Sequence, residues 1–213
     1  FRGYISYFNF TLGKIDKNKL YKMKKIILKH KYELILCIFV FVYILYFALA
    51  SFLKYDNFYT GRFDLGNMDQ TVWNSLHGRI FELTDPNGTA IVSRLSFHAD
   101  FILILISPLY LIWSNPKMLL ILQTVTLALG GIVVYQIAMQ VLKNKSLALI
   151  LGIIFLFNPA VHYTNLYDFH PVTLGTTLLL ITFYYFLKKK YLLFFIFAIL
   201  SGLTKEHVWA IIS

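Results

Sequence analysis

The run Leu34–Leu53 is the sequence feature that most limits how this chain can fold. It holds twenty residues and no charged side chain. As a helix it would be about 30 Å long, which matches the thickness of the hydrocarbon core of a bilayer. The run is longer than the apolar stretch of a signal peptide, and no small-residue cleavage site follows it. It therefore predicts a membrane-spanning helix.

The composition extends this conclusion to the whole chain. Of its 213 residues, 58% are hydrophobic and 14% are charged, whereas a soluble domain is about half apolar and about a quarter charged. The net charge of +10 does not indicate a nucleic-acid partner, because eight of the twenty basic residues lie between Lys14 and Lys31, just before the first apolar run. This is the pattern of a cytoplasmic flank in contact with membrane lipid. We predict an integral, multi-pass protein of the cell membrane with a cytoplasmic N-terminus.

Two regions are expected. Residues 1–33 form a basic cytoplasmic segment, and residues 34–213 form the transmembrane domain, interpreted as a fragment of a longer protein. The chain begins with Phe1, and the first methionine that could serve as a start is Met23. We therefore expect residues 1–22 to be an upstream extension that is not native to the fold.

Four further apolar runs follow the first and bring the predicted spans to five. These are Met118–Leu142, which is long enough to cross unaided, and the shorter Ser146–Val161, Val172–Leu187 and Tyr191–Thr204. The run Phe101–Trp113 has thirteen residues and is divided by Pro108, so it is expected to lie at the membrane interface.

The treatment of residues 101–113 decides the topology. If they do not span, the loop 54–117 is external, and the lysine clusters at 143–145 and 188–190 return to the cytoplasm. If they do span, both clusters face outwards, against the positive-inside rule. We take the first arrangement. It also places eight of the ten acidic residues on the external side, and Val72, Trp73 and Leu76 at helical spacing predict an interfacial helix within the loop.

Polar clusters then gather on the external face from segments far apart in the chain. They are Asp64 with Asp69, Arg94 with His98 and Asp100, Asn165 with Asp168 and His170, and Lys205 with Glu206. Carboxylates, imidazoles and cations at one face could bind a divalent ion, a phosphate or a sugar. Each residue also has an ordinary interpretation. The acids can cap helices, the cations can contact lipid headgroups, and His170 can precede a helix that starts at Pro171.

Several of these residues belong to motifs with a family resemblance. The motifs are Phe63-Asp64-Leu65-Gly66 with Asp69-Gln70, Ser93-Arg94-Leu95 with His98, Asn165-Leu166-Tyr167-Asp168-Phe169-His170-Pro171, and Lys205-Glu206. In this order they resemble the family of predicted membrane proteins called domain of unknown function 2079, over about residues 34–213. The layout of that family is in turn similar to the class C glycosyltransferases, which use sugars linked to polyprenyl phosphate.

The resemblance implies a fold and a set of roles. The fold is an all-α bundle of transmembrane helices, similar to class C glycosyltransferases, with interfacial helices in a long external loop. Asp64 or Asp69 would be the catalytic base. Arg94, His98, Asn165, His170 and Lys205 would bind the donor, and Asp69, Asp168 and Glu206 would hold a divalent cation. Two alternatives stay open: an ion-coupled transporter, in which these acids and histidines form a relay, and a non-catalytic membrane scaffold.

Overall fold

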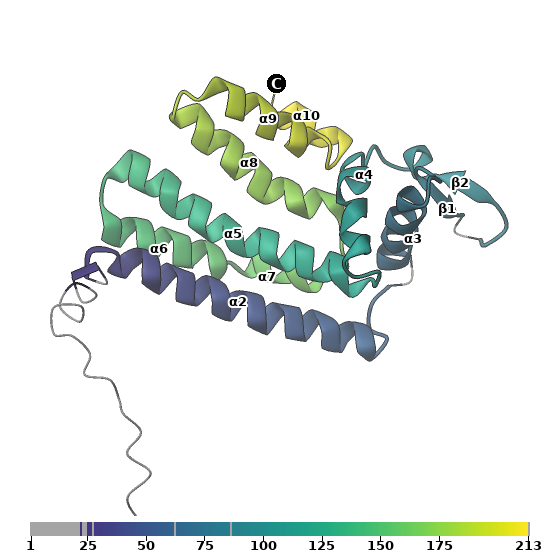
Figure 1. Cartoon of the computed structure of the whole chain (residues 1–213), viewed down its shortest axis with the longest axis horizontal. Helices are drawn as coiled ribbons and strands as arrows, with labels where there is room; N and C mark the ends of the chain where they lie inside the picture. Colours follow the sequence, from purple (N-terminus) through teal and green to yellow (C-terminus); the bar gives the residue numbers. More distant parts are fainter. Residues whose placement is uncertain (1–21, 23–24, 27, 62, 86, 213) are drawn as a thin grey trace, which may run out of the picture.

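A computed structural model describes residues 22, 25–26, 28–61, 63–85 and 87–212. The predicted extension 1–22 and the start at Met23 fall outside the described residues, apart from Lys22. The described chain is built from helices with one small hairpin of strands, which confirms the all-α prediction in its main part. Figure 1 shows long helices running side by side, with the shorter elements gathered at one end.

The long helices form a bundle around one central member. That member is α5, Lys117–Leu142, which packs against α2, α6 and α8, while α9 packs on α8. The bounds of the others are α2, Lys31–Asp56; α6, Lys145–Leu156; α7, Pro159–Leu166; α8, Pro171–Leu187; and α9, Tyr191–Gly202. The chain continues into η3, Glu206–Val208, and α10, Trp209–Ile212. Among the described residues, α2 and α5 are long and apolar enough to cross a membrane, and α6 with α7 can count as a third, bent span.

The five-span prediction is therefore supported for three of its segments. The predicted bounds of the first two lie within three residues of α2 and within one residue of α5. Helices α8 and α9 have 17 and 12 residues, below the length that would identify them as spans by composition alone. Their crossing of the membrane stays a prediction.

The predicted span Ser146–Val161 is helical but interrupted, because the chain breaks near the end of this run. Helix α6 ends at Leu156 and α7 begins at Pro159, with a bend of 40° between them. Proline cannot donate the backbone bond that would continue the helix. The Asn158 side chain instead caps α7 by accepting from Ala160 N at 2.9 Å. The His162 ring donates from Nε2 to the Leu156 carbonyl at 2.5 Å, so this freed carbonyl has a partner inside an apolar bundle.

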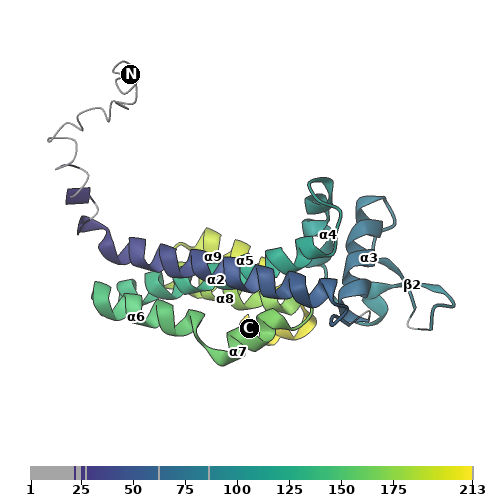
Figure 2. The same cartoon turned by 90° about the horizontal axis from the view of Figure 1, so that it is seen from below.

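The connection between α2 and α5 folds into a compact unit at one end of the bundle, which we call the loop end (Figures 1 and 2). The elements are α3, Asp64–Leu76; β1, Glu82–Thr84; β2, Ile91–Ser93; η1, Arg94–Ser96; α4, Ile102–Ile106; and η2, Ser107–Leu111. The short apolar helix predicted at 101–113 is confirmed. It consists of two consecutive short helices, α4 and η2, and together they are too short to span a membrane.

The hairpin of β1 and β2 was not predicted. The strands are antiparallel, with Leu83 opposite Val92, and the turn predicted around residues 85–88 connects them. Gln70 of α3 fixes the hairpin to the helix, because its amide donates to Thr84 Oγ1 at 2.9 Å and its carbonyl accepts from Thr84 N at 3.0 Å. Apolar residues of α3, α4, α5 and α8 close a core beneath it, together with the fully buried Phe169 from the segment before α8.

The opposite end of the bundle, the lysine end, carries the turns 143–144 and 188–190 together with the start of α2 (Figure 1). Glu33 of α2 accepts from Lys145 of α6 at 2.9 Å and from the Tyr135 hydroxyl at 3.0 Å. Both lysine turns are thus on the same side of the bundle as the start of α2, as the predicted topology requires. Which side of the membrane this is stays a prediction.

Candidate functional site

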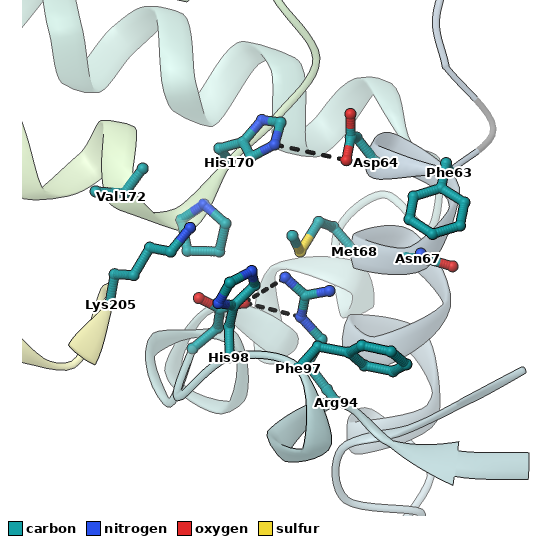
Figure 3. Close-up of a pocket in the computed structure, with 12 residues that line it drawn as sticks. Phe63, Asp64, Asn67, Met68, Arg94, Phe97, His98, His170, Val172 and Lys205 are labelled. Carbon is teal, nitrogen blue, oxygen red and sulfur yellow. Dashed lines mark hydrogen bonds and ion pairs between the residues drawn. The ribbon is translucent and has the colours of Figure 1, made fainter. Parts of the chain in front are cut away.

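Five of the predicted site residues line one pocket at the loop end. They come from four separate parts of the chain: Asp64 from α3, Arg94 and His98 from the segment after β2, His170 from the start of α8, and Lys205 from the turn after α9. Figure 3 shows them around a common space, whose volume is about 140 Å³. The other lining residues are Phe63, Asn67, Met68, Phe97, Asp100, Pro171 and Val172.

Asp64 is the partly exposed acid of this pocket. It is the first residue of α3, where the helix dipole favours a negative charge. His170 lies opposite, with Nε2 at 3.7 Å from Asp64 Oδ1. The other ring nitrogen, Nδ1, is 2.9 Å from the Asp168 backbone carbonyl, which can only accept, so Nδ1 carries a proton. Nε2 is therefore the nitrogen that can exchange a proton with Asp64 or a ligand.

Tyr167 shares the electrostatic field of this acid. The Asp64 carboxylate raises the pKa of the exposed Tyr167 hydroxyl, followed by desolvation and then by the Asp168 carboxylate. The rings of Tyr167 and His170 lie 5.3 Å apart. Tyr167 is therefore a neutral hydrogen-bonding group at the rim of the site at physiological pH.

Arg94 and Asp100 form a buried ion pair in the pocket wall. The guanidinium donates from Nε and Nη2 to the same oxygen, Asp100 Oδ2, at 2.8 and 2.6 Å. Both side chains are less than a tenth exposed. A charge at this depth needs its partner, so Arg94 is held in place and is only partly available to a ligand.

Lys205 is the freest cation of the pocket. Its side chain extends into the space in Figure 3, and it makes no hydrogen bond or ion pair with any other residue that the structure describes. Its neighbour Glu206 ties the same turn to the segment after β2, accepting from His98 Nδ1 at 3.0 Å and from Ala99 N at 3.1 Å. A bond from its own backbone amide, followed by these two, lowers the pKa of Glu206 to about 2.

Four predicted residues lie away from the pocket lining: Glu206, described above, and Asp69, Asn165 and Asp168. Asp69 is bonded to the Tyr110 hydroxyl, and its burial raises the pKa of its carboxyl group. Asn165 is fully buried in the bundle, where it accepts from Thr124 at 3.0 Å and donates to the Tyr43 hydroxyl at 3.3 Å.

Asp168 connects the segment before α8 to the segment before α3. Its Oδ2 accepts from Gly61 N at 2.6 Å, and its Oδ1 lies 3.3 Å from Lys54 Nζ at the end of α2. A Cβ atom at position 61 would stand 2.9 Å from this oxygen, so a larger residue there would require the Asp168 carboxylate to shift. Asp168 thus orients the chain three residues before Asp64.

The three residues predicted to hold a metal are not brought together. Asp69, Asp168 and Glu206 each have a separate set of partners. Within the described part of the chain, no group of three or more His, Cys, Asp or Glu side chains could hold a metal ion. The pocket instead combines one partly exposed acid, two imidazoles and one ammonium group that has no partner among the described residues.

Comparison with known proteins agrees with the motifs on which the pocket is built. A family model described as a predicted membrane protein, DUF2079, matches residues 54–213, which is most of the chain. The chain belongs to this family. No curated protein and no solved structure matches it. All twelve residues that line the pocket lie within the region shared with the DUF2079 family.

Some pocket residues of this DUF2079 protein were missed by sequence reasoning. Asn67 and Met68 follow Asp64 by three and four positions, so they lie on the same face of α3, and this spacing was the available signal. Phe63 is part of a motif but was given no role, and Phe97 and Val172 have no signal beyond their position next to a motif residue.

Proposed function

We propose that this DUF2079 protein is a membrane-embedded glycosyltransferase that uses a polyprenyl-phosphate-linked sugar at the external face of the membrane. The observation that carries the proposal is the meeting of the Asp64 carboxylate, the His170 imidazole and the unpaired Lys205 ammonium group in one pocket at the end of a bundle with membrane-spanning helices. These are a base, a proton carrier and an anion-binding group.

The chemistry assigns each group a role. Asp64 accepts the proton of an acceptor hydroxyl as its oxygen attacks the anomeric carbon of the sugar. The bond between that carbon and the phosphate oxygen breaks, and the phosphate leaves with the electron pair. Lys205 lies in the same pocket and stabilises the negative charge that develops on the leaving phosphate. His170 keeps Asp64 oriented through the approach at 3.7 Å.

The proposal narrows the set of catalytic residues to one of the two acids. Asp69 is held by Tyr110, and its raised pKa reflects burial away from the pocket. We therefore assign Asp69 a structural role. No step is routed through a metal ion, because the residues expected to bind one have separate partners.

The experiment uses the full chain in liposomes with a panel of polyprenyl-phosphate sugars. Asp64→Asn removes the base but keeps the shape, so turnover should fall roughly 10²–10⁴-fold while donor binding is retained. Lys205→Gln should weaken binding of the donor. Glu82→Gln is the matched control, since Glu82 is an exposed acid at the loop end that does not line the pocket, and it should leave both quantities unchanged.

A different result would indicate a transporter. If no donor binds, and Asp64→Asn changes only an ion flux and its pH dependence, the protein is a transporter and the transferase proposal is wrong.

A further inference from the structure

A second hollow of the molecule is apolar and separate from the polar pocket. It lies between α2 and the break that separates α6 from α7, and its volume is about 480 Å³, which is within the range of roughly 300–1,000 Å³ usual for small-molecule sites. We call it the groove. Its lining residues are Ile38, Phe39, Val42, Tyr43, Tyr46, Phe47, Leu156, Phe157, His162 and Leu166.

The helix break forms the groove and leaves apolar surface exposed in it. Because α7 turns away from the axis of α6, the rings of His162 and Phe47 meet with centroids 4.7 Å apart where a straight helix would pack. Two of the polar groups that reach this surface are already bonded to the protein. His162 Nε2 bonds to the Leu156 carbonyl, and the Tyr43 hydroxyl accepts from Asn165.

The groove opens sideways from the bundle. Ile38, Val42 and Tyr46 form one edge along α2, and each is more than half exposed. Since α2 is one of the helices able to cross the membrane, this edge faces hydrocarbon rather than water. An occupant must therefore enter from the bilayer, and its matching part must be a hydrocarbon chain.

One short stretch of chain connects the groove to the polar pocket. Leu166 lines the groove and His170 lines the pocket. Four residues of extended chain reach at most roughly 14 Å, so the two hollows are within the reach of one lipid molecule. Between them lies the half-exposed Tyr167 ring, whose centroid is 5.3 Å from that of the His170 ring and 5.9 Å from Lys54 Nζ. The path thus changes from apolar to aromatic to cationic.

We infer that the groove binds the polyprenyl chain of a lipid phosphate whose head group lies in the polar pocket. The inference rests on the proposed function for the choice of lipid. The polyprenyl tail occupies the space between α2 and α7 and passes Tyr167. Its phosphate then lies in the polar pocket, beside Asp64 and Lys205.

The test uses a polyprenyl phosphate that has no sugar and carries a photoreactive diazirine in its hydrocarbon tail. This lipid is added to liposomes that contain the whole protein. Irradiation should label groove residues of α2 and α7, and unlabelled polyprenyl phosphate should compete. Val42→Trp fills the groove and should reduce this labelling about tenfold, which corresponds to about 1.4 kcal/mol of binding. Leu45→Trp is the matched control, because Leu45 is equally exposed on α2 but does not line the groove, and it should label as the parent does.

Two outcomes would overturn the inference. One is labelling that is spread evenly around α2 and is the same in the Val42→Trp and Leu45→Trp variants. The other is equal competition by an anionic phospholipid, which would make the groove a site for ordinary membrane lipid.

The test also separates this inference from the proposed function. Asp64→Asn should leave the labelling intact, so groove labelling without sugar transfer counts against the transferase alone. Sugar transfer that is unaffected by Val42→Trp, with no label in the groove, counts against the groove alone.

Discussion

The two ends of the bundle carry charge in opposite ways. At the loop end, acids are matched to cations. Arg94 pairs with Asp100 in the same segment, and three pairs join distant parts of the chain: Lys54 with Asp168, Lys117 with Asp56 and His98 with Glu206. At the lysine end, the turns 143–144 and 188–190 gather basic residues, and Glu33 is the one acid that the described residues place among them.

The difference shows which end is built for specific geometry. Long-range pairs at the loop end fix four segments around a pocket, so a change in one partner should disturb the others. Lysines on short turns can interact with solvent or with anionic lipid headgroups and need no specific protein partner. The lysine end should therefore tolerate substitution, provided that its positive charge is kept. The following predictions test this contrast.

The largest expected effect concerns which end faces outwards. In a Cys37→Ser background, single cysteines at Asn87 and Ser114 should react with a membrane-impermeant thiol reagent added outside intact cells, and a cysteine at Lys190 should not. All three positions are exposed, so access depends on the membrane alone. If the cysteine at Lys190 reacts and those at Asn87 and Ser114 are protected, the orientation is opposite to the predicted one and the pocket faces the cytoplasm.

The next effect concerns the buried pair at the loop end. Asp100→Ala leaves the buried Arg94 charge without a partner, and such a loss costs about 3–5 kcal/mol. Amide hydrogen exchange over residues 91–106 should report this as faster local opening. The double change of Arg94→Met with Asp100→Leu should recover most of the loss, because it removes both charges.

The matched control for this prediction is an exposed pair in the same unit. Arg79 and Glu82 approach at 4.0 Å with both side chains about half exposed, so Glu82→Gln should cost less than about 1 kcal/mol. Equal effects at the two pairs would contradict the view that buried pairing holds the pocket together.

The smallest effect is a pH dependence at the Glu206 contact. The pKa of Glu206 is about 2 in the folded chain, below its ordinary value of 4.5, so the charged form is favoured by folding. The stabilisation is complete above about pH 4.5 and is lost as the pH falls towards 2. The protection factor of the Ala99 amide, which donates to this carboxylate, should fall over that interval. A Glu206→Gln variant should show a flat profile, and an unchanged profile in the parent would remove Glu206 from this role.

Much of the bundle was predictable because it depends on length and hydrophobicity. The bounds of α2 and α5 follow from uninterrupted apolar runs, and the short helix before α5 follows from a run of thirteen residues. The start of α8 at Pro171 follows from the preference of proline for the first turn. The break before Pro159 was missed because the apolar run continues through it, although Asn158-Pro159 was a local signal.

The hairpin was missed for a different reason. Each strand has three residues, too few to show the alternation by which a strand is recognised, and the turn signal alone does not fix its flanks. Its position depends on Gln70, whose pairing with Thr84 joins residues fourteen apart.

For the site, the sequence identified residues but not their partners. Asp64 and Asp69 were grouped because they are close in sequence, yet five residues on a helix place side chains roughly 140° apart, so one faces the pocket and the other faces Tyr110. Sequence spacing likewise could not reveal that the side chains of Asn165 and Asp168 form hydrogen bonds with other parts of the protein and not with a ligand. Those contacts exist only after distant helices have packed.

The shortness of α6 and α9 has a consequence for how the protein is made. Each has twelve residues, or about 18 Å of helix, and so neither can cross a core of about 30 Å by itself during synthesis. Each is joined by a tight basic turn to a longer helix, α6 to α5 and α9 to α8. We therefore expect the pair to be the unit of membrane insertion, entering as a helical hairpin, and the predicted orientation keeps its lysine turn on the ribosome side.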